Sequence, residues 1–298
     1  MANHGETERH LIKLFTEAKQ FTYKENKYEI LKIGKPRPSR GECKTDIYIL
    51  CKDNLGGNTE FKISIKQADA DFLENKMSYE RAVEIFGDDA EKILIESILK
   101  IKESFENEPL INFSKFKRTE TNCIKIGWKF ELINKAGGDK SSELILNDDQ
   151  KIDVYSGTNL NVSKKNCKVN GELIENSGVA NFILEVDRIE DDLNYYITRL
   201  EDITSYAIER KIYFACKALN YRVNANKWDG DRPLSVFCDW SINSENKLEG
   251  KLIFDKPLQF KGNAIGNNIR VLLDKLGINS DNFTSIKSKL SSTVKLHE

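Results

Sequence analysis

The sequence predicts an α/β fold, because segments with strand periodicity lie between segments with helix periodicity. Residues 7–21 and 88–105 carry apolar side chains at the spacing of one helical face. Residues 45–52 and 60–66 instead alternate apolar and polar side chains and are rich in β-branched residues, which is typical of strands. This order predicts a mixed central sheet with helices packed against it.

The two predicted strands form a hairpin around residues 53–58, where asparagine and glycine tolerate the positive φ of a tight turn. A turn centred on Gly56 sets Asp46 opposite Lys66 and Tyr48 opposite Ser64. Directly opposed side chains lie about 4.5–5.5 Å apart. We therefore expect Asp46 and Lys66 to converge on one ligand, the alternative being a plain salt bridge on an exposed hairpin.

The second strand ends in Ser64-Ile65-Lys66, and thirteen residues separate Lys66 from Glu80. In this pattern residues 41–80 resemble the PD-(D/E)xK nuclease superfamily, and within it the type II restriction endonucleases that read CCGG-containing sites. In that subgroup a serine or threonine replaces the acid of the acid-x-Lys triplet. A carboxylate on a helix, at this same spacing beyond the lysine, replaces the missing acid.

The resemblance implies a restriction-endonuclease-like sheet and a Mg²⁺-dependent, site-specific hydrolysis of double-stranded DNA that leaves 5′-phosphate ends. It implies that Asp46, Glu80 and the backbone carbonyl of Ile65 bind Mg²⁺. Lys66 would then activate the attacking water, and Ser64 would occupy the vacated acid position. It also implies a cytoplasmic homodimer, with a cognate DNA methyltransferase as a functional partner that makes no stable contact.

Other acids compete for the place of the second catalytic carboxylate. The triplet Glu60-Phe61-Lys62 has the ordinary acid-x-Lys form, but the predicted register puts Glu60 opposite Lys52, at the turn end of the hairpin. Glu42 lies in a probable loop before Asp46, and Glu17 lies on the first predicted helix. Glu80 ranks first, then Glu42, then Glu60, with Glu17 expected to be a solvated helix residue.

The sequence departs from the family pattern at two places. Thr45 stands where proline commonly precedes the catalytic aspartate. No arginine follows Lys66 within residues 67–73, where the CCGG-reading subgroup carries its recognition arginines. We therefore transfer the roles of the family's catalytic residues to this chain, but not the DNA sequence that the subgroup recognises.

A basic, proline-containing segment precedes the hairpin and should be extended, because each proline disfavours helix at the preceding residue. We expect four of its cations to bind phosphates beside the scissile bond. The alternative is a solvated basic loop. These cations are Lys35, Arg37, Arg40 and Lys44.

Composition excludes several other classes of site. The three histidines all lie near the termini, which argues against histidine-based hydrolysis and leaves carboxylates and carbonyls as metal ligands, a set that suits Mg²⁺. The six cysteines are dispersed without a CxxC pair, as expected of reduced thiols. The net charge of −1 requires any DNA-binding cations to be sorted onto one face.

No apolar run is long enough to span a membrane, and the N-terminal residues lack the apolar core of a signal peptide. We expect a single domain, with its catalytic core in residues 1–110, a β-rich insertion at about 112–190, and residues 191–298 completing the core, the dimer or the DNA-reading surface. Ser78 should cap a short helix ending at Gly87. A long helix over 193–220 should offer a dimer interface, and Asp229-Gly230-Asp231 should be a turn.

Two other functions use the same residues. One is a monomeric repair or mismatch nicking endonuclease of the same fold. The other is a DNA-binding protein that keeps the nuclease fold without activity. The complete set of Asp46, Lys66 and Glu80 favours an active enzyme.

Overall fold

The computed structural model describes residues 4–68 and 71–298, and the chain divides into two compact units. The first unit comprises Met1–Asp71 and Leu146–Arg210, and the second comprises Phe72–Ile145 and Lys211–Glu298. Both contain sheets and helices, so the α/β class is confirmed. The chain leaves the first unit over residues 72–145, and this excursion differs from the insertion expected at 112–190. The difference arises because residue 146 already belongs to the first unit again and Phe182–Val186 is a strand of its sheet.

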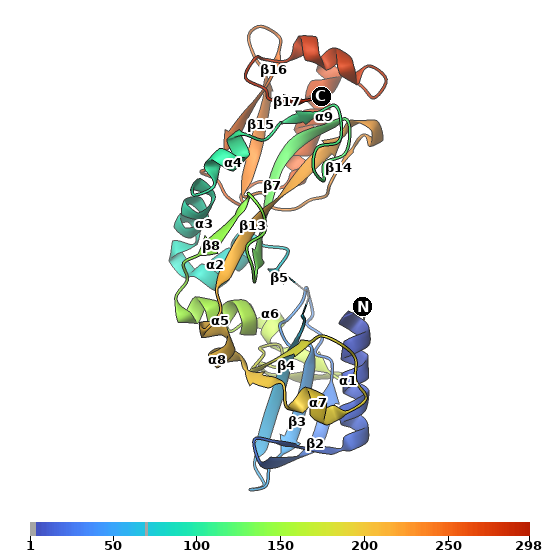
Figure 1. Cartoon of the computed structure of the whole chain (residues 1–298), viewed down its shortest axis with the longest axis vertical. Helices are drawn as coiled ribbons and strands as arrows, with labels where there is room; N and C mark the ends of the chain where they lie inside the picture. Colours follow the sequence, from blue (N-terminus) through green and yellow to red (C-terminus); the bar gives the residue numbers. More distant parts are fainter. Residues whose placement is uncertain (1–3, 69–70) are drawn as a thin grey trace. The chain divides into compact units, whose positions relative to one another are not determined.

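The first unit is built on a six-stranded mixed sheet (Figure 1). Its hairpin β3–β4 is antiparallel, whereas β11 lies parallel to β4 on the other side. In spatial order the strands are β1 (Gln20–Tyr23), β2 (Asn26–Gly34), β3 (Ile47–Lys52), β4 (Asn58–Gln67), β11 (Phe182–Val186) and β12 (Leu200–Asp202).

One face of this sheet packs against α1 (His4–Ala18) and α7 (Leu193–Ile197). Leu11 and Phe15 of α1 are buried against apolar residues that alternate along the strands. The ring of Phe61 stacks on Phe182 with their centroids 4.9 Å apart. The helix predicted over 7–21 ends three residues early because Phe21 already belongs to β1.

The hairpin turn forms within the predicted residues 53–58, but it is centred on Leu55 and not on Gly56, so the register differs from the predicted one. Asp53 Oδ1 accepts hydrogen bonds from the amides of Leu55 (2.9 Å) and Gly57 (2.8 Å), and Gly56 has φ 85°. Tyr48 pairs with Lys62 instead of Ser64, so the ladder is shifted by two residues from the predicted one. A shift of two leaves every side chain on its expected face, which is why the alternation alone could not detect it.

The other face of the sheet is covered by elements that follow the excursion. These include α5, which an Asn147–Gln150 capping box begins, and α8, which begins where the Asp202 carboxylate accepts from the Ser205 amide. The elements are α5 (Asp148–Ser156), α6 (Val162–Lys165), the hairpin of β9 (Cys167–Val169) and β10 (Glu172–Ile174), and α8 (Ile203–Ile208).

The predicted helix over 193–220 is wrong. The segment contains α7, β12, α8 and the start of β13 (Ile212–Arg222), because Leu200–Asp202 pairs with β11 and residues from 212 onward pair with β7. Its apolar side chains, such as Tyr196 and Ile203, are buried within the chain. They therefore do not form the exposed dimer surface that the sequence suggested.

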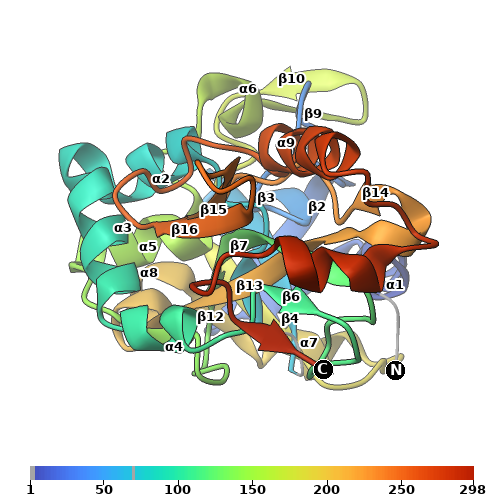
Figure 2. The same ribbon diagram turned by 90° about the horizontal axis from the view of Figure 1, so that it is seen from above.

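The second unit is centred on a long antiparallel pair, β7 (Cys123–Ile133) and β13. Helix α9 (Gly262–Lys275) packs against β13 and β15 (Figure 2). The remaining strands are β5 (Phe72–Glu74), β6 (Ile111–Asn112), β8 (Ser141–Leu144), β14 (Lys227–Trp228), β15 (Val236–Ile242), β16 (Leu248–Ile253) and β17 (Leu296–His297).

Three α-helices and a short 3₁₀ helix (Gly87–Asp89) connect β5 to β6 in this unit. The hydroxyl oxygen of Ser78 accepts from the amide of Arg81, and Gly87 at φ 69° ends α2 (Tyr79–Phe86), as predicted. The helix predicted over 88–105 is divided at residues 100–101 into α3 (Ala90–Leu99) and α4 (Lys102–Glu106). No helix in the described ranges, 4–68 and 71–298, is long and apolar enough to cross a membrane.

The Asp229-Gly230-Asp231 segment is a structural turn, as expected. The Asp229 carboxylate accepts from the amide of Asn220 (3.0 Å) and from Arg222 Nε (2.6 Å), which ties the turn to β13. Asp231 accepts from the amide of Asn263 at the start of α9 (3.1 Å). These two carboxylates hold the second unit together.

A buried ion cluster lies in the second unit. The Glu108 carboxylate contacts Lys125 Nζ (2.8 Å) and Lys140 Nζ, and Lys125 is fully buried. Burial opposes ionisation of Glu108, but the charges of and hydrogen bonds from Lys125 and Lys140 outweigh it and lower the pKa of Glu108. Burial, opposed by the Glu108 charge, lowers the pKa of Lys125.

We predict that Glu108→Gln destabilises the second unit by about 3–5 kcal/mol, because it removes the counter-charge of the fully buried Lys125 and leaves Lys140 with only Asp139, 3.8 Å away. The Glu108 pKa is lowered on folding, so its contribution is present above the unfolded pKa of about 4.3 and disappears as pH falls through the folded value. Urea unfolding at neutral and acidic pH measures both effects. The exposed Glu103→Gln is the matched control, and equal losses in the two variants would contradict the prediction.

Candidate active site

Asp46 lies at the end of the sheet where β3 begins and β4 ends. Its amide donates to the carbonyl of Ile63 (2.8 Å), and its Oδ2 accepts from the amide of Ile65 (2.7 Å). The carboxylate is half-buried. Asp46 is therefore fixed beside the Ser64-Ile65-Lys66 triplet, and the observed register replaces the direct pairing with Lys66 that the sequence predicted.

The backbone of Ile65 adds a second oxygen at this point. In an antiparallel ladder the N–H and C=O of one residue point towards the same neighbour. Because the Ile65 N–H bonds to Asp46, the Ile65 carbonyl also points to that edge. A hard-oxygen pair of this kind suits Mg²⁺, which is bound through one or two carboxylates and keeps several waters.

The acids do not gather into a larger cluster. Across residues 4–68 and 71–298, no group of three His, Cys, Asp or Glu side chains is arranged to hold a metal ion. A Mg²⁺ ion at this point would therefore take most of its ligands from water or substrate oxygens, with the Asp46 carboxylate and the Ile65 carbonyl as the oxygen ligands that the protein offers.

Ser64 and Lys66 share the face of β4 opposite the apolar core, and β11 extends this face. Glu185 is the direct partner of Lys66 in the parallel β4–β11 ladder. The Tyr206 hydroxyl on α8 donates to Glu185 Oε1, and burial together with this bond raises the pKa of Tyr206. Glu185 is thus an oriented carboxylate beside Lys66, and the sequence analysis missed it because β11 is distant in the chain.

Glu80 lies in the second unit, in the first turn of α2, with its side chain exposed. Bonds to its own amide and to the Ser78 hydroxyl lower the pKa of Glu80. The carboxylate therefore stabilises a helix N-terminus, which is the structural explanation that the sequence allowed. Its approach to Asp46 within about 4–6 Å, which sharing one Mg²⁺ requires, stays a prediction.

The reserve acids occupy different surroundings. Glu60 pairs across from Leu50, accepts from the Tyr48 hydroxyl (2.6 Å) and contacts Lys62 Nζ (3.5 Å). It lies four residues before Ser64, about 13 Å along the strand. Glu17 is exposed on α1 next to Lys13, and Glu42 is exposed in the loop before Asp46.

The helix acid that α1 buries is Glu8, which the sequence analysis did not single out. It is 5% exposed and pairs with Lys35, the residue that follows β2. Gly34 pairs with Tyr48, so Lys35 leaves the sheet at the same end as Asp46. The helical spacing could have indicated the burial of Glu8, because Glu8 lies three residues before Leu11 on the buried face of α1.

A pair of cysteines lies next to the Asp46 loop. Cys43 Sγ donates to the carbonyl of Thr45 (3.3 Å) and Cys167 Sγ to the carbonyl of Lys164 (3.1 Å), and the interaction between the two sulfurs together with burial raises the pKa of Cys43. The same interaction lowers the pKa of Cys167 on β9. The pair joins the loop before β3 to the β9–β10 hairpin, although both residues are free thiols.

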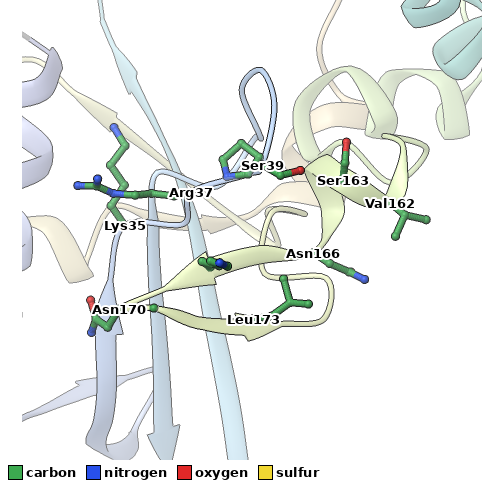
Figure 3. A pocket seen from close by; sticks show the side chains of 11 residues that line it. Lys35, Arg37, Ser39, Val162, Ser163, Asn166, Asn170 and Leu173 are labelled. Carbon is green, nitrogen blue, oxygen red and sulfur yellow. The ribbon is translucent and has the colours of Figure 1, made fainter.

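The predicted basic segment lines a cavity of about 780 Å³ (Figure 3). Lys35, Arg37 and Ser39 reach it from the 35–39 segment, and Asn166, Asn170 and Leu173 reach it from the β9–β10 region. Arg40 is exposed in the same loop and does not line the cavity. Lys44 is half-buried, with its amide bonded to the carbonyl of Gly178 (3.0 Å).

Comparison of this chain with protein family models, with curated proteins and with solved structures found no match.

We predict that Glu185→Gln weakens Mn²⁺ binding, used as a spectroscopic substitute for Mg²⁺, by about tenfold or more. The reason is that Glu185 is the carboxylate next to Lys66 within the unit that holds Asp46. Electron paramagnetic resonance of free Mn²⁺ measures the change. Unchanged affinity would remove Glu185 from the site.

The same Mn²⁺ titration is carried out in parallel on two further variants, Glu80→Gln and Glu60→Gln. The spacing of the nuclease family predicts that Glu80→Gln binds Mn²⁺ more weakly than the wild type. Glu60 is engaged with Tyr48, so Glu60→Gln serves as the matched control. Normal Mn²⁺ binding by Glu80→Gln would contradict the interpretation that Glu80 replaces the acid missing from the Ser64-Ile65-Lys66 triplet.

Proposed function

We propose that this protein is a Mg²⁺-dependent endonuclease of the type II restriction kind, which hydrolyses phosphodiester bonds in double-stranded DNA. The observation that carries the proposal is the hydrogen bond from the Ile65 amide to Asp46. It places a carboxylate, a strand carbonyl and the Ser64-x-Lys66 pair at one end of a mixed sheet flanked by helices. That combination supports the resemblance found in residues 41–80.

The proposed roles follow from the chemistry of each group. Asp46 and the Ile65 carbonyl hold the ion, which when bound supplies Lewis acidity to the phosphodiester oxygens. Lys66 orients the attacking water, assists its deprotonation and offsets phosphate charge. The Ser64 hydroxyl donates a hydrogen bond where other family members have an acid. Water adds to phosphorus and the 3′ oxygen leaves, giving 5′-phosphate and 3′-hydroxyl ends.

We predict that Asp46→Asn and Lys66→Ala each reduce cleavage by about 100-fold or more, since each removes a charge that acts on the reacting phosphate. Asp46→Asn keeps an oxygen that accepts from Ile65, so folding and DNA affinity should be retained. Plasmid cleavage with Mg²⁺ gives the rates, and circular dichroism verifies folding.

Lys62→Ala is the matched control, because Lys62 lies on the same face of the same strand and pairs with Glu60. It should cut at near the wild-type rate. Cleavage by Lys66→Ala within about tenfold of wild type would remove the nuclease assignment at this site. DNA binding without any cleavage by the wild type would favour the inactive DNA-binding alternative.

We further propose a homodimer on palindromic DNA, since two cuts on antiparallel strands match two-fold symmetry. The monomeric nicking enzyme is the second candidate, and it is favoured by one observation, the burial of Tyr196 and Ile203 inside the chain.

Sedimentation with and without DNA should show a dimer on the duplex, with both strands cut. A monomer that nicks only one strand would contradict the dimer and select the repair-type activity. The nuclease proposal itself stands or falls on the cleavage assay above, so the two results are independent.

A further inference from the structure

Two cations face each other in the first unit with no carboxylate partner in the part of the chain that the structure describes. Arg37 and Lys168 form an isolated antiparallel bridge in which each amide donates to the other's carbonyl, both at 2.9 Å. Such hydrogen-bonded pairs have Cα atoms about 5.5 Å apart and side chains on the same side. Both side chains are exposed and line the same cavity.

The pairing is electrostatically unfavourable as it stands. Like charges directly opposite one another destabilise a strand pair. Among residues 4–68 and 71–298, neither Arg37 nor Lys168 has a carboxylate partner. The neighbouring cations differ, because Lys35 pairs with Glu8 and Lys32 pairs with Glu172. The Glu8 and Glu172 carboxylates are therefore engaged by other lysines.

More positive charge lies around the pair. Arg40 in the 37–41 loop, and Lys164 and Lys165 on α6, also have no carboxylate partner within the part of the chain described. The side chain of Lys164 approaches Gly41, so α6 and this loop are in contact. In a chain of net charge −1, five such cations on adjoining segments form a local basic surface.

The cavity also offers groups other than cations. Val162 and Leu173 line it, with 69% and 63% of their surfaces exposed. The amide nitrogen of Asn170 donates to the carbonyl of Ile33 (2.8 Å), which fixes the tip of the hairpin against β2. Exposed apolar side chains beside paired cations suit a ligand that joins anionic groups to apolar faces, as the phosphates and sugars of a nucleic acid strand do.

We propose that Arg37 and Lys168 together bind a backbone phosphate of a DNA strand, with Arg40, Lys164 and Lys165 along its path. The backbone bridge holds the two cations of this site in place before the ligand binds. A phosphate between the two side chains relieves their repulsion. The choice of DNA as the polyanion rests on the proposed function. Lys168, in the region expected from the sequence to be a β-rich insertion, is thereby proposed as a substrate-binding residue.

The test measures the affinity of the full-length protein for a short fluorescein-labelled duplex in EDTA, which prevents cleavage, over a series of salt concentrations. Each lost phosphate contact should reduce the slope of log K against log salt by about 0.9. We expect that reduction for Arg37→Gln and for Lys168→Gln, with weaker binding at low salt. Lys13→Gln removes the same charge from α1, where Glu17 pairs with it, and should change neither quantity.

Thermal unfolding of the free proteins gives a second, independent readout. Removing one of two repelling cations should leave Tm unchanged or raise it at low salt, so binding and stability should move in opposite directions. A lower Tm together with weaker binding would show a structural role for the pair and overturn the proposal. Inorganic phosphate that competes as effectively as duplex at equal phosphate concentration would also overturn it, in favour of a small-anion site.

The outcomes separate this inference from the proposed activity. Wild-type cleavage of DNA with unchanged salt slopes in both variants refutes the phosphate site and leaves the nuclease intact. Reduced slopes in a protein that cuts no DNA refute the nuclease and keep the phosphate site.

Discussion

The hydrogen bond between the Ile65 amide and the Asp46 carboxylate is the contact on which the candidate site depends. It closes the β3–β4 ladder at the point where the backbone pairing ends, and it fixes the Asp46 side chain beside the Ser64-x-Lys66 triplet. A carboxylate that accepts from a backbone amide is oriented without help from a mobile partner. The same bond directs the Ile65 carbonyl to that edge, so one strand end supplies two oxygens of different kinds.

The remaining part of this sheet is completed only after a long excursion. The chain leaves β4, builds residues 72–145 of the second unit, and returns through α5 before β11 pairs with β4. Lys66 and Glu185 are adjacent strand partners although they are far apart in sequence. Pairing of this kind closes a large loop, which slows folding but lets a site combine residues from distant segments.

The two units manage their buried and exposed charges differently. In the second unit, Glu108 compensates Lys125 and Lys140, and the Asp229 carboxylate ties Arg222 to a turn. In the first unit, Lys35 and Lys32 have acidic partners, whereas Arg37 and Lys168 face each other across a bridge with no carboxylate partner among the described residues. Compensated pairs hold elements together, and the uncompensated pair is the one proposed above to bind an external anion.

The sequence by itself determined the local elements of this protein. Alternation predicted β3 and β4, turn chemistry predicted a reversal within residues 53–58, and Ser78 and Gly87 marked the ends of α2, because each of these signals acts within a few residues. Tertiary structure decided what local periodicity does not contain. A two-residue slip between β3 and β4 preserves every face, so the partner of Tyr48 depended on the whole sheet. The segment from 193 to 220 has helical spacing, yet pairing of β12 with β11 and of β13 with β7 overrides it. Glu185 beside Lys66, and Lys168 opposite Arg37, likewise exist only through contacts between segments distant in the chain, which no single-sequence pattern encodes.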